Sequence, residues 1–338
     1  MSTSAFSAAL GQAHDLLRWC SPLRTELWAA RLSASLKPDQ VGPFLRELGE
    51  DGSAEARLTL VALAAVNPLP GTGGQHVPGP GDQYTPGPGD LYARAAEGLG
   101  DTVPEWARRM GRVACEGACY GKADPYGEQA LAVLSFRYEN GREPHILVVG
   151  IDQPNGGLAV EALVEEVTFL DDLGLAPAEP GAVAGWVLEA FELGDRVMGA
   201  RVAVTLPEVR PLATARARAV PGLVRGAADT TLARFDGVPD LPGAWEAFGK
   251  LAEFVGDRPL WWSPSRVSRF LTSWLPREAV LSEEAVGAMP EVLRAWTRYS
   301  GDQPAVLRQI DEDAPRLPAL MADESRWSLG KRLARNRL

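Results

Sequence analysis

Apolar residues in the first 66 positions recur at spacings of three and four, which is the period of an amphipathic helix. Ser21-Pro22 and Lys37-Pro38 interrupt this pattern. Both pairs suit the start of a new helix, because proline is well tolerated in a first helical turn. Residues 1–66 are therefore predicted to form an N-terminal helical segment, as a small bundle or as a pair of helical hairpins.

The periodic pattern stops at residues 67–90, where 13 of 24 residues are Gly or Pro. The octapeptide VPGPGDQY is followed directly by TPGPGDLY. Two short repeats with so few apolar side chains do not provide a hydrophobic core. We expect this Gly/Pro-rich segment, with its tandem octapeptide, to be a flexible linker.

Residues 91–206 show the composition of β-strands mixed with helices. Two β-rich runs, 129–138 and 145–151, flank Asn140-Gly141, a dipeptide that favours the tight turn of a hairpin. Residues 112–120 predict a third strand.

Three further elements complete this predicted α+β domain. Apolar residues at 158, 163, 167 and 170 fall on overlapping helical faces, so 158–170 is predicted to be a helix, as is 182–193. Residues 201–206, RVAVTL, predict one more strand. The expected fold class is α+β and mostly helical, with a small antiparallel meander of three to four strands packed against helices.

Residues 207–338 read as a Trp-rich helical C-terminal region that holds six of the ten tryptophans. Ser263-Pro264 predicts a helix start, with an N-cap followed by proline in the first turn. Four tryptophans at helical spacing are candidates for lining an aromatic pocket, although packing between helices explains the same spacing. They are Trp261, Trp262, Trp274 and Trp296.

The distribution of charge bears on whether the protein binds nucleic acid. The net charge of −10 opposes binding of a nucleic acid by the whole surface. A local basic cluster near the end of the chain could still contact nucleic acid, or could stabilise the end of a helix. It consists of Lys331, Arg332, Arg335 and Arg337.

The sequence shows no apolar run of the roughly 20 residues that span a bilayer and no basic-then-apolar leader. The three cysteines are too few for a disulfide framework. We expect a cytoplasmic bacterial protein with no membrane partner.

The candidate chemistry lies in and around the loop IDQPNGG, which follows strand 145–151. Asp152, Asn155, Gly156 and Gly157 are candidates for a ligand-binding loop. By their order along the chain, four carboxylates are candidates for the metal ligands of a two-metal phosphodiesterase. They are Asp124, Glu128, Asp152 and Glu161.

The motifs of the common enzyme classes are missing from the sequence. The strands lack the acid-x-Lys pattern of restriction-type nucleases, and the chain has no GxSxG, GxGxxG or GxxxxGK[ST] motif. Cys115 and Cys119 have no second pair of cysteines or histidines for a zinc site. No metal and no cofactor is therefore predicted.

The segment WSPSRVSRFLTSWLP at 262–276 and the IDQPNGG loop resemble a family of actinomycete proteins of unknown function. The resemblance covers about the C-terminal two thirds of the chain and implies no catalytic residue. The expected function is that of a non-catalytic binding or adaptor protein that acts through protein-protein contacts. Two alternatives remain open, a metal-dependent nuclease or other phosphodiester hydrolase and a nucleic-acid-binding regulator that acts through the basic C-terminus.

Overall fold

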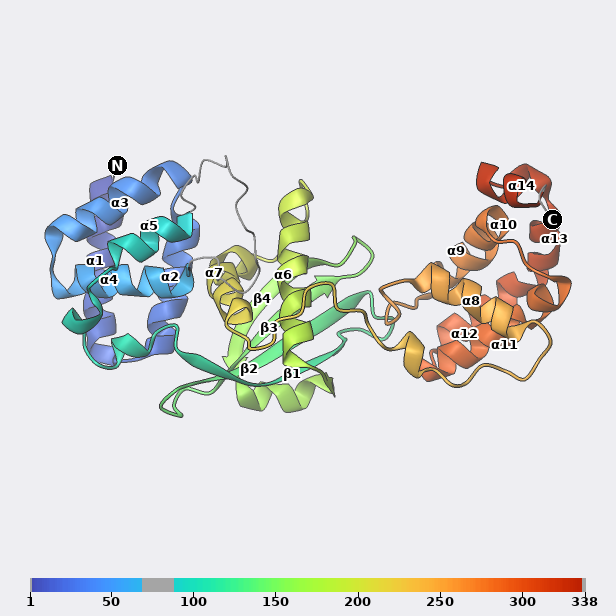
Figure 1. Cartoon of the computed structure of the whole chain (residues 1–338), viewed down its shortest axis with the longest axis horizontal. Coiled ribbons are helices and arrows are strands. Elements are labelled where there is room, and N and C mark those ends of the chain that lie inside the picture. Colours follow the sequence, from blue (N-terminus) through green and yellow to red (C-terminus); the bar gives the residue numbers. More distant parts are fainter. Residues whose placement is uncertain (1, 69–87, 336–338) are drawn as a thin grey trace, which may run out of the picture. The chain divides into compact units, whose positions relative to one another are not determined.

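The chain combines many helices with one five-stranded antiparallel sheet, which confirms the predicted α+β class (Figure 1). A computed structural model describes residues 2–68 and 88–335. The chain folds into two compact units. The first unit contains Met1–Tyr120, Leu131–Ile151 and Leu158–Gly226, and the second contains Gly121–Ala130, Asp152–Gly157 and Ala227–Leu338.

The N-terminal helices of the first unit form where the apolar period predicts them. The side chains of Ser21 and Ser53 cap two of these helices by accepting hydrogen bonds from backbone N–H groups three residues later. Leu48, Leu58 and Leu63 are fully buried between the helices. The helices are α1 (Ser2–Trp19), α2 (Pro22–Ser35), α3 (Pro38–Asp51), α4 (Ala54–Val66) and α5 (Pro88–Ala95).

The predicted linker, 67–90, lies mostly outside the described residues, because the structure does not describe 69–87. The end of the second octapeptide belongs to α5, which begins at Pro88. Tyr92 of this helix is buried, and its hydroxyl lies 3.5 Å from that of Ser33. The last residues of the repeat are thus part of the helical core.

The sheet follows the first unit's helical segment and has the strand order β4-β3-β2-β1-β5. The β2–β3 hairpin lies where the Asn140-Gly141 turn predicts it, and Gly141 takes the positive φ of 75° that such a turn requires. β3 is buried along almost its whole length. The strands are β1 (Val113–Lys122), β2 (Gln129–Tyr138), β3 (His145–Asp152), β4 (Leu158–Glu166) and β5 (Ala176–Pro177).

The prediction of a helix at 158–170 is wrong, because this segment forms β4 and then the 3-10 turn Val167–Leu173. Gly156 and Gly157 both have positive φ, at 98° and 86°, and they reverse the chain so that β4 returns beside β3. Apolar residues over such a short window fit a helical face and a strand equally well. Pairing with β3 decides between the two.

The prediction of a strand at 201–206 is also wrong. Residues 201–203 belong to no strand, although Ala203 N–H donates a hydrogen bond to Val160 O of β4 at 2.7 Å. Thr205 then begins α7, with Pro207 in its first turn, where proline favours a helix. The helix predicted at 182–193 is confirmed. The two helices that follow the sheet are α6 (Pro180–Arg196) and α7 (Thr205–Arg218).

A buried polar cluster joins α2, β2, β3 and α7 inside the first unit. Glu26, Tyr138, His145 and Arg216 are each at most 2% exposed. Arg216 Nη2 and the Tyr138 hydroxyl both donate to Glu26 Oε2, while Gly111 N–H donates to Oε1 at 2.5 Å. Arg216 Nε donates to His145 Nε2 at 3.3 Å. The cluster satisfies its own charges and hydrogen bonds, as buried charges must.

Acidification is expected to destabilise the first unit through His145. Burial lowers the pKa of His145 to about 4, and the charge of Arg216 lowers it as well. The hydrogen bond to the Glu143 carbonyl and the charge of Glu26 act in the opposite direction. Because the pKa of histidine in an unfolded chain is about 6.5, the neutral ring stabilises the fold above that pH. This contribution is lost as the pH falls from about 6.5 to about 4, so the free energy of unfolding should drop by about 3 kcal/mol. Urea unfolding across this pH range measures the drop.

His145→Gln is the matched control for this pH dependence. Glutamine keeps an acceptor for Arg216 but does not titrate, so the variant should lose stability less steeply with acid than the wild type. Equal slopes for the two proteins would exclude His145 as the cause.

Most of the second unit comes from the C-terminal part of the chain, whose described residues from 227 onward form helices but no strand, in agreement with the predicted helical character. The Ser263 side chain accepts a hydrogen bond from Arg266 N–H, so the predicted helix start at Ser263-Pro264 is confirmed. In the described part of the chain, no helix has the length and apolar character needed to cross a membrane. The unit contains α8 (Ala244–Val255), α9 (Pro264–Arg269), a π-helical segment (Phe270–Trp274), α10 (Leu275–Glu278), α11 (Glu283–Tyr299), α12 (Pro304–Asp313), α13 (Leu317–Ala322) and α14 (Leu329–Arg335).

Candidate functional site

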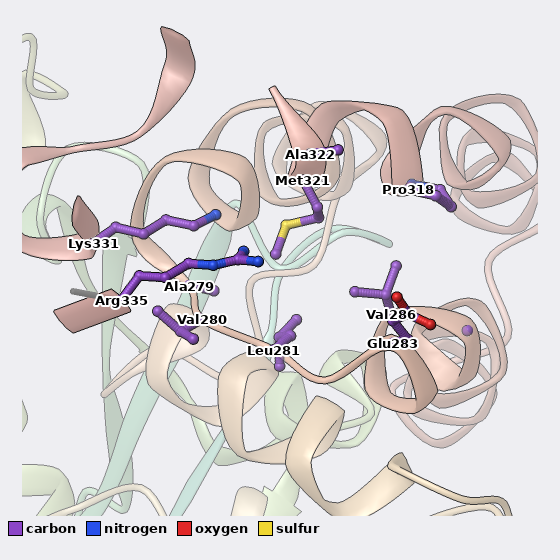
Figure 2. Close-up of a pocket in the computed structure, with 11 residues that line it drawn as sticks. Ala279, Val280, Leu281, Glu283, Val286, Pro318, Met321, Ala322, Lys331 and Arg335 are labelled. Carbon is purple, nitrogen blue, oxygen red and sulfur yellow. The ribbon is translucent and has the colours of Figure 1, made fainter. Parts of the chain in front are cut away.

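A pocket of about 430 Å³ in the second unit combines an apolar lining with charged groups (Figure 2). Its volume lies within the range of small-molecule and side-chain binding sites. The walls come from the connection after α10, the first two turns of α11, and the helices α13 and α14. The lining residues are Ala279, Val280, Leu281, Glu283, Val286, Gly287, Pro318, Met321, Ala322, Lys331 and Arg335.

Two cations enter the pocket from α14. Figure 2 shows Lys331 and Arg335 extending into it from the same side. They lie one helical turn apart, at i and i+4, and therefore share a face of the helix. Trp327 supports both, since Lys331 Nζ is 5.2 Å and Arg335 Cζ 5.0 Å from the centre of its ring.

Lys331 is held in place by burial and by one hydrogen bond. It is only 3% exposed, and its Nζ donates to Pro276 O at 2.7 Å. Burial lowers the pKa of Lys331, as does nearby Arg335, whereas Glu278 opposes the shift. An ammonium group has three donors, so the hydrogen bond to Pro276 leaves capacity for an acceptor from a ligand.

The opposite side of the pocket carries a carboxylate. Figure 2 shows Glu283 across from Lys331 and Arg335, with Met321 reaching between them. Glu283 is in the first turn of α11, which Ser282 caps by accepting from Ala285 N–H at 3.1 Å. No ion pair joins Glu283 to either cation in the described structure. The pocket therefore offers two positive groups and an apolar floor, with a negative group at the far rim.

Gly287 keeps the pocket open along α11. A Cβ added at this position would meet no atom within 4 Å. Residue 287 is exposed and helical, so a larger side chain there would enter the space without a clash in the helix itself.

The four predicted aromatic-pocket residues divide into two pairs. Trp262 and Trp296 are fully buried in the core of the second unit, and Trp262 Nε1 donates to Thr297 Oγ1 at 3.0 Å. Trp261 and Trp274 do line a pocket, of about 490 Å³, and this pocket is different from the one in Figure 2.

Two of the four carboxylates considered as metal ligands, Asp152 and Asp124, form hydrogen bonds within their own loops. Asp152 accepts from Asn155 Nδ2 at 2.7 Å, and Gly157 N–H donates to the Asp152 carbonyl at 2.8 Å. Asp124 accepts from the N–H groups of Tyr126 and Gln129, at 2.8 Å and 2.6 Å. Both aspartates thereby close the turns in which they lie.

The other two carboxylates do not complete a metal site. The side chain of Glu128 is exposed in the second unit, whereas Glu161 is exposed on β4 in the first unit. Over residues 2–68 and 88–335, no group of three or more His, Cys, Asp or Glu side chains is arranged to hold a metal ion. Burial also raises the pKa of Cys115 and Cys119, which disfavours the thiolates that zinc binds.

The basic residues near the end of the chain do not share one exposed surface. Lys331 is buried, and Arg332 Nη2 donates to Glu324 O at 3.2 Å. Arg337 lies outside the described residues. The sequence identified Lys331 and Arg335 as candidates, but it gave no sign of the apolar wall that faces them, because Met321 and Val286 come from other helices.

A scan against protein-family models, a search of curated proteins and a search of solved structures each found no match.

Proposed function

We propose that this protein is a non-catalytic binding protein and that the pocket in Figure 2 recognises an acidic group next to an apolar side chain on a partner protein. The observation that supports this most directly is the position of Lys331 and Arg335, which extend from one helical face into an apolar pocket. A carboxylate of the partner would bind between the two cations. Its neighbouring apolar side chain would contact Met321, Leu281 and Val286.

The chemistry of the pocket favours recognition over catalysis. It holds neither a histidine nor a cysteine, and its only carboxylate, Glu283, is exposed. Charge-assisted hydrogen bonds in a partly desolvated site are strong and directional, which suits the recognition of a carboxylate. Because the net charge of the protein is −10, most of its surface repels an acidic partner. Such a partner is therefore directed to a local cationic site.

A library of short random peptides displayed on phage and selected on the full-length protein would test this function. We expect the enriched peptides to place Asp, Glu or a C-terminal carboxylate beside an apolar residue. Arg335→Gln should weaken the binding of such a peptide about 10- to 100-fold, because one charged hydrogen bond is lost. Fluorescence anisotropy of the labelled peptide measures this change.

Gly287→Leu and Gly249→Leu form a matched pair for the same titration. Both replace an exposed helical glycine whose added Cβ meets no atom within 4 Å, but only position 287 lines the pocket. Gly287→Leu should abolish binding, whereas Gly249→Leu should leave it unchanged. The proposed site is wrong if no peptide is enriched, or if the enriched peptides bind both variants like the wild type.

A further inference from the structure

A second pocket of the same unit has a different lining, made of aromatic rings and arginines. It has a volume of about 490 Å³. Its walls come from the end of α8, from the connection to α9, from α9 itself and from the π-helical segment. The lining residues are Phe254, Trp261, Ser265, Arg266, Arg269 and Trp274.

Arg266 forms the fixed part of this pocket. It is only 7% exposed, and its two terminal nitrogens donate to backbone carbonyls, including Trp261 O at 2.7 Å and Val255 O at 3.0 Å. Its guanidinium carbon lies 4.0 Å from the centre of the Trp261 ring and 5.4 Å from that of Phe254. The cation is therefore held rigidly against two aromatic rings.

Among the described residues, no carboxylate forms a direct ion pair with the two arginines of this pocket. Carbonyl oxygens satisfy the donors of Arg266 but carry no full negative charge. In the part of the chain that the structure describes, neither Arg266 nor Arg269 has a carboxylate oxygen within 4.0 Å. Burial lowers the pKa of Arg266 to about 9, and the neighbouring Arg258 and Arg269 act in the same direction, whereas the carboxylate of Asp257 opposes the shift. A bound anion would relieve this unfavourable environment.

The aromatic walls provide flat surfaces beside these cations. The ring of Trp274 lies 5.5 Å from that of Phe254 and 5.7 Å from that of Phe270, measured between centroids. Trp274 ends the five-residue π-helical segment Phe270–Trp274. A π-helical turn is rare and occurs frequently at functional sites.

We infer that this pocket binds a small planar aromatic anion, whose ring lies against Trp261 and Trp274 and whose charged group pairs with Arg269 beside Arg266. The ring satisfies the flat apolar walls, and the anion compensates the two guanidinium groups. An aromatic carboxylate and a nucleoside phosphate share this chemistry. The inference does not depend on the function proposed for the pocket in Figure 2, because the two pockets share no residue.

Isothermal titration calorimetry of the full-length protein would test the inference with four probes. 2-Naphthoate has a flat ring and a carboxylate, 2-naphthamide keeps the ring without the charge, adenosine monophosphate joins a ring to a phosphate, and inorganic phosphate lacks the ring. We expect 2-naphthoate or adenosine monophosphate to bind with a dissociation constant of about 1 mM or tighter. The preferred probe identifies the source of the anion, while the amide and inorganic phosphate should bind at least about tenfold more weakly.

Arg269→Gln and Arg308→Gln locate the binding event. Both arginines are exposed, so both variants should fold, but only Arg269 lines the pocket. Arg269→Gln should weaken the better probe about tenfold, and Arg308→Gln should leave its affinity unchanged. The inference is overturned if neither ring-bearing anion binds, if the amide binds as well as the naphthoate, or if Arg269→Gln has no effect.

Discussion

Replacing Arg216 by methionine should lower the free energy of unfolding of the first unit by about 3–5 kcal/mol, the cost of breaking a buried ion pair by removing one partner. Glu26 is fully buried, and Arg216 is the cation that pairs with it. The remaining donors to Glu26 are the Tyr138 hydroxyl and Gly111 N–H, which carry no full positive charge. Urea titration read out by hydrogen exchange in β2 and β3 follows this unit separately from the second.

Arg225→Met provides the surface comparison for this prediction. Arg225 pairs with Glu189 and Glu192, but its side chain is 40% exposed, so its loss should cost at most about 1 kcal/mol. A second check is the double variant Glu26→Leu with Arg216→Met, which removes both buried charges. It should cost less than the sum of the two single variants, and strict additivity would show that the two charges do not depend on each other.

The sequence was a good guide where a local signal determines the structure. Asn140-Gly141 defines the β2–β3 hairpin, and Ser263-Pro264 defines a helix start, because each depends on a turn or cap of a few residues. β4 could not be recognised in this way. Its identity depends on pairing with β3, and its apolar spacing also fits a helix.

The buried cluster could not be predicted from the sequence, because its residues come from distant parts of the chain. Glu26 and Arg216 are 190 positions apart, so no local pattern distinguishes them from charges on exposed helix surfaces. In a chain with many arginines, the sequence around Arg216 does not distinguish it from an exposed arginine. Only the packing of α7 on α2 and the sheet makes it the counter-ion of a buried glutamate.

The candidate sites likewise depend on residues that are far apart in the sequence. The basic cluster drew attention to Lys331 and Arg335, but Glu283 and Met321, from α11 and α13, complete their pocket. Among the tryptophans, helical spacing cannot separate Trp261 and Trp274, which line a pocket, from Trp262 and Trp296, which fill the core. That division depends on the tertiary packing around the connection before α9, the π-helical segment and α11.

Gly185→Ala should destabilise the first unit by about 3 kcal/mol through overpacking between α6 and the segment that follows α7. A Cβ at this position would lie 1.8 Å from Val224 O, so the backbone would have to move. Val224 N–H donates to Gly181 O at 3.0 Å, and Gly226 N–H donates to Glu189 Oε1 at 2.6 Å, which docks the segment on the helix. Displacement of this segment should expose the bond after Arg225 to trypsin. Limited proteolysis followed by mass spectrometry measures the cleavage directly.

Gly194→Ala in the same helix separates this steric effect from helix propensity. A Cβ at Gly194 meets no atom within 4 Å, so this change should leave stability unchanged or raise it by up to about 1 kcal/mol, because alanine favours a helix over glycine. The rate of cleavage after Arg225 should then match that of the wild type. The two variants gain the same helix propensity and differ only in the carbonyl that the new methyl group would meet. If Gly185→Ala were as stable and as resistant to trypsin as Gly194→Ala, the close approach of Val224 to α6 would not constrain the fold.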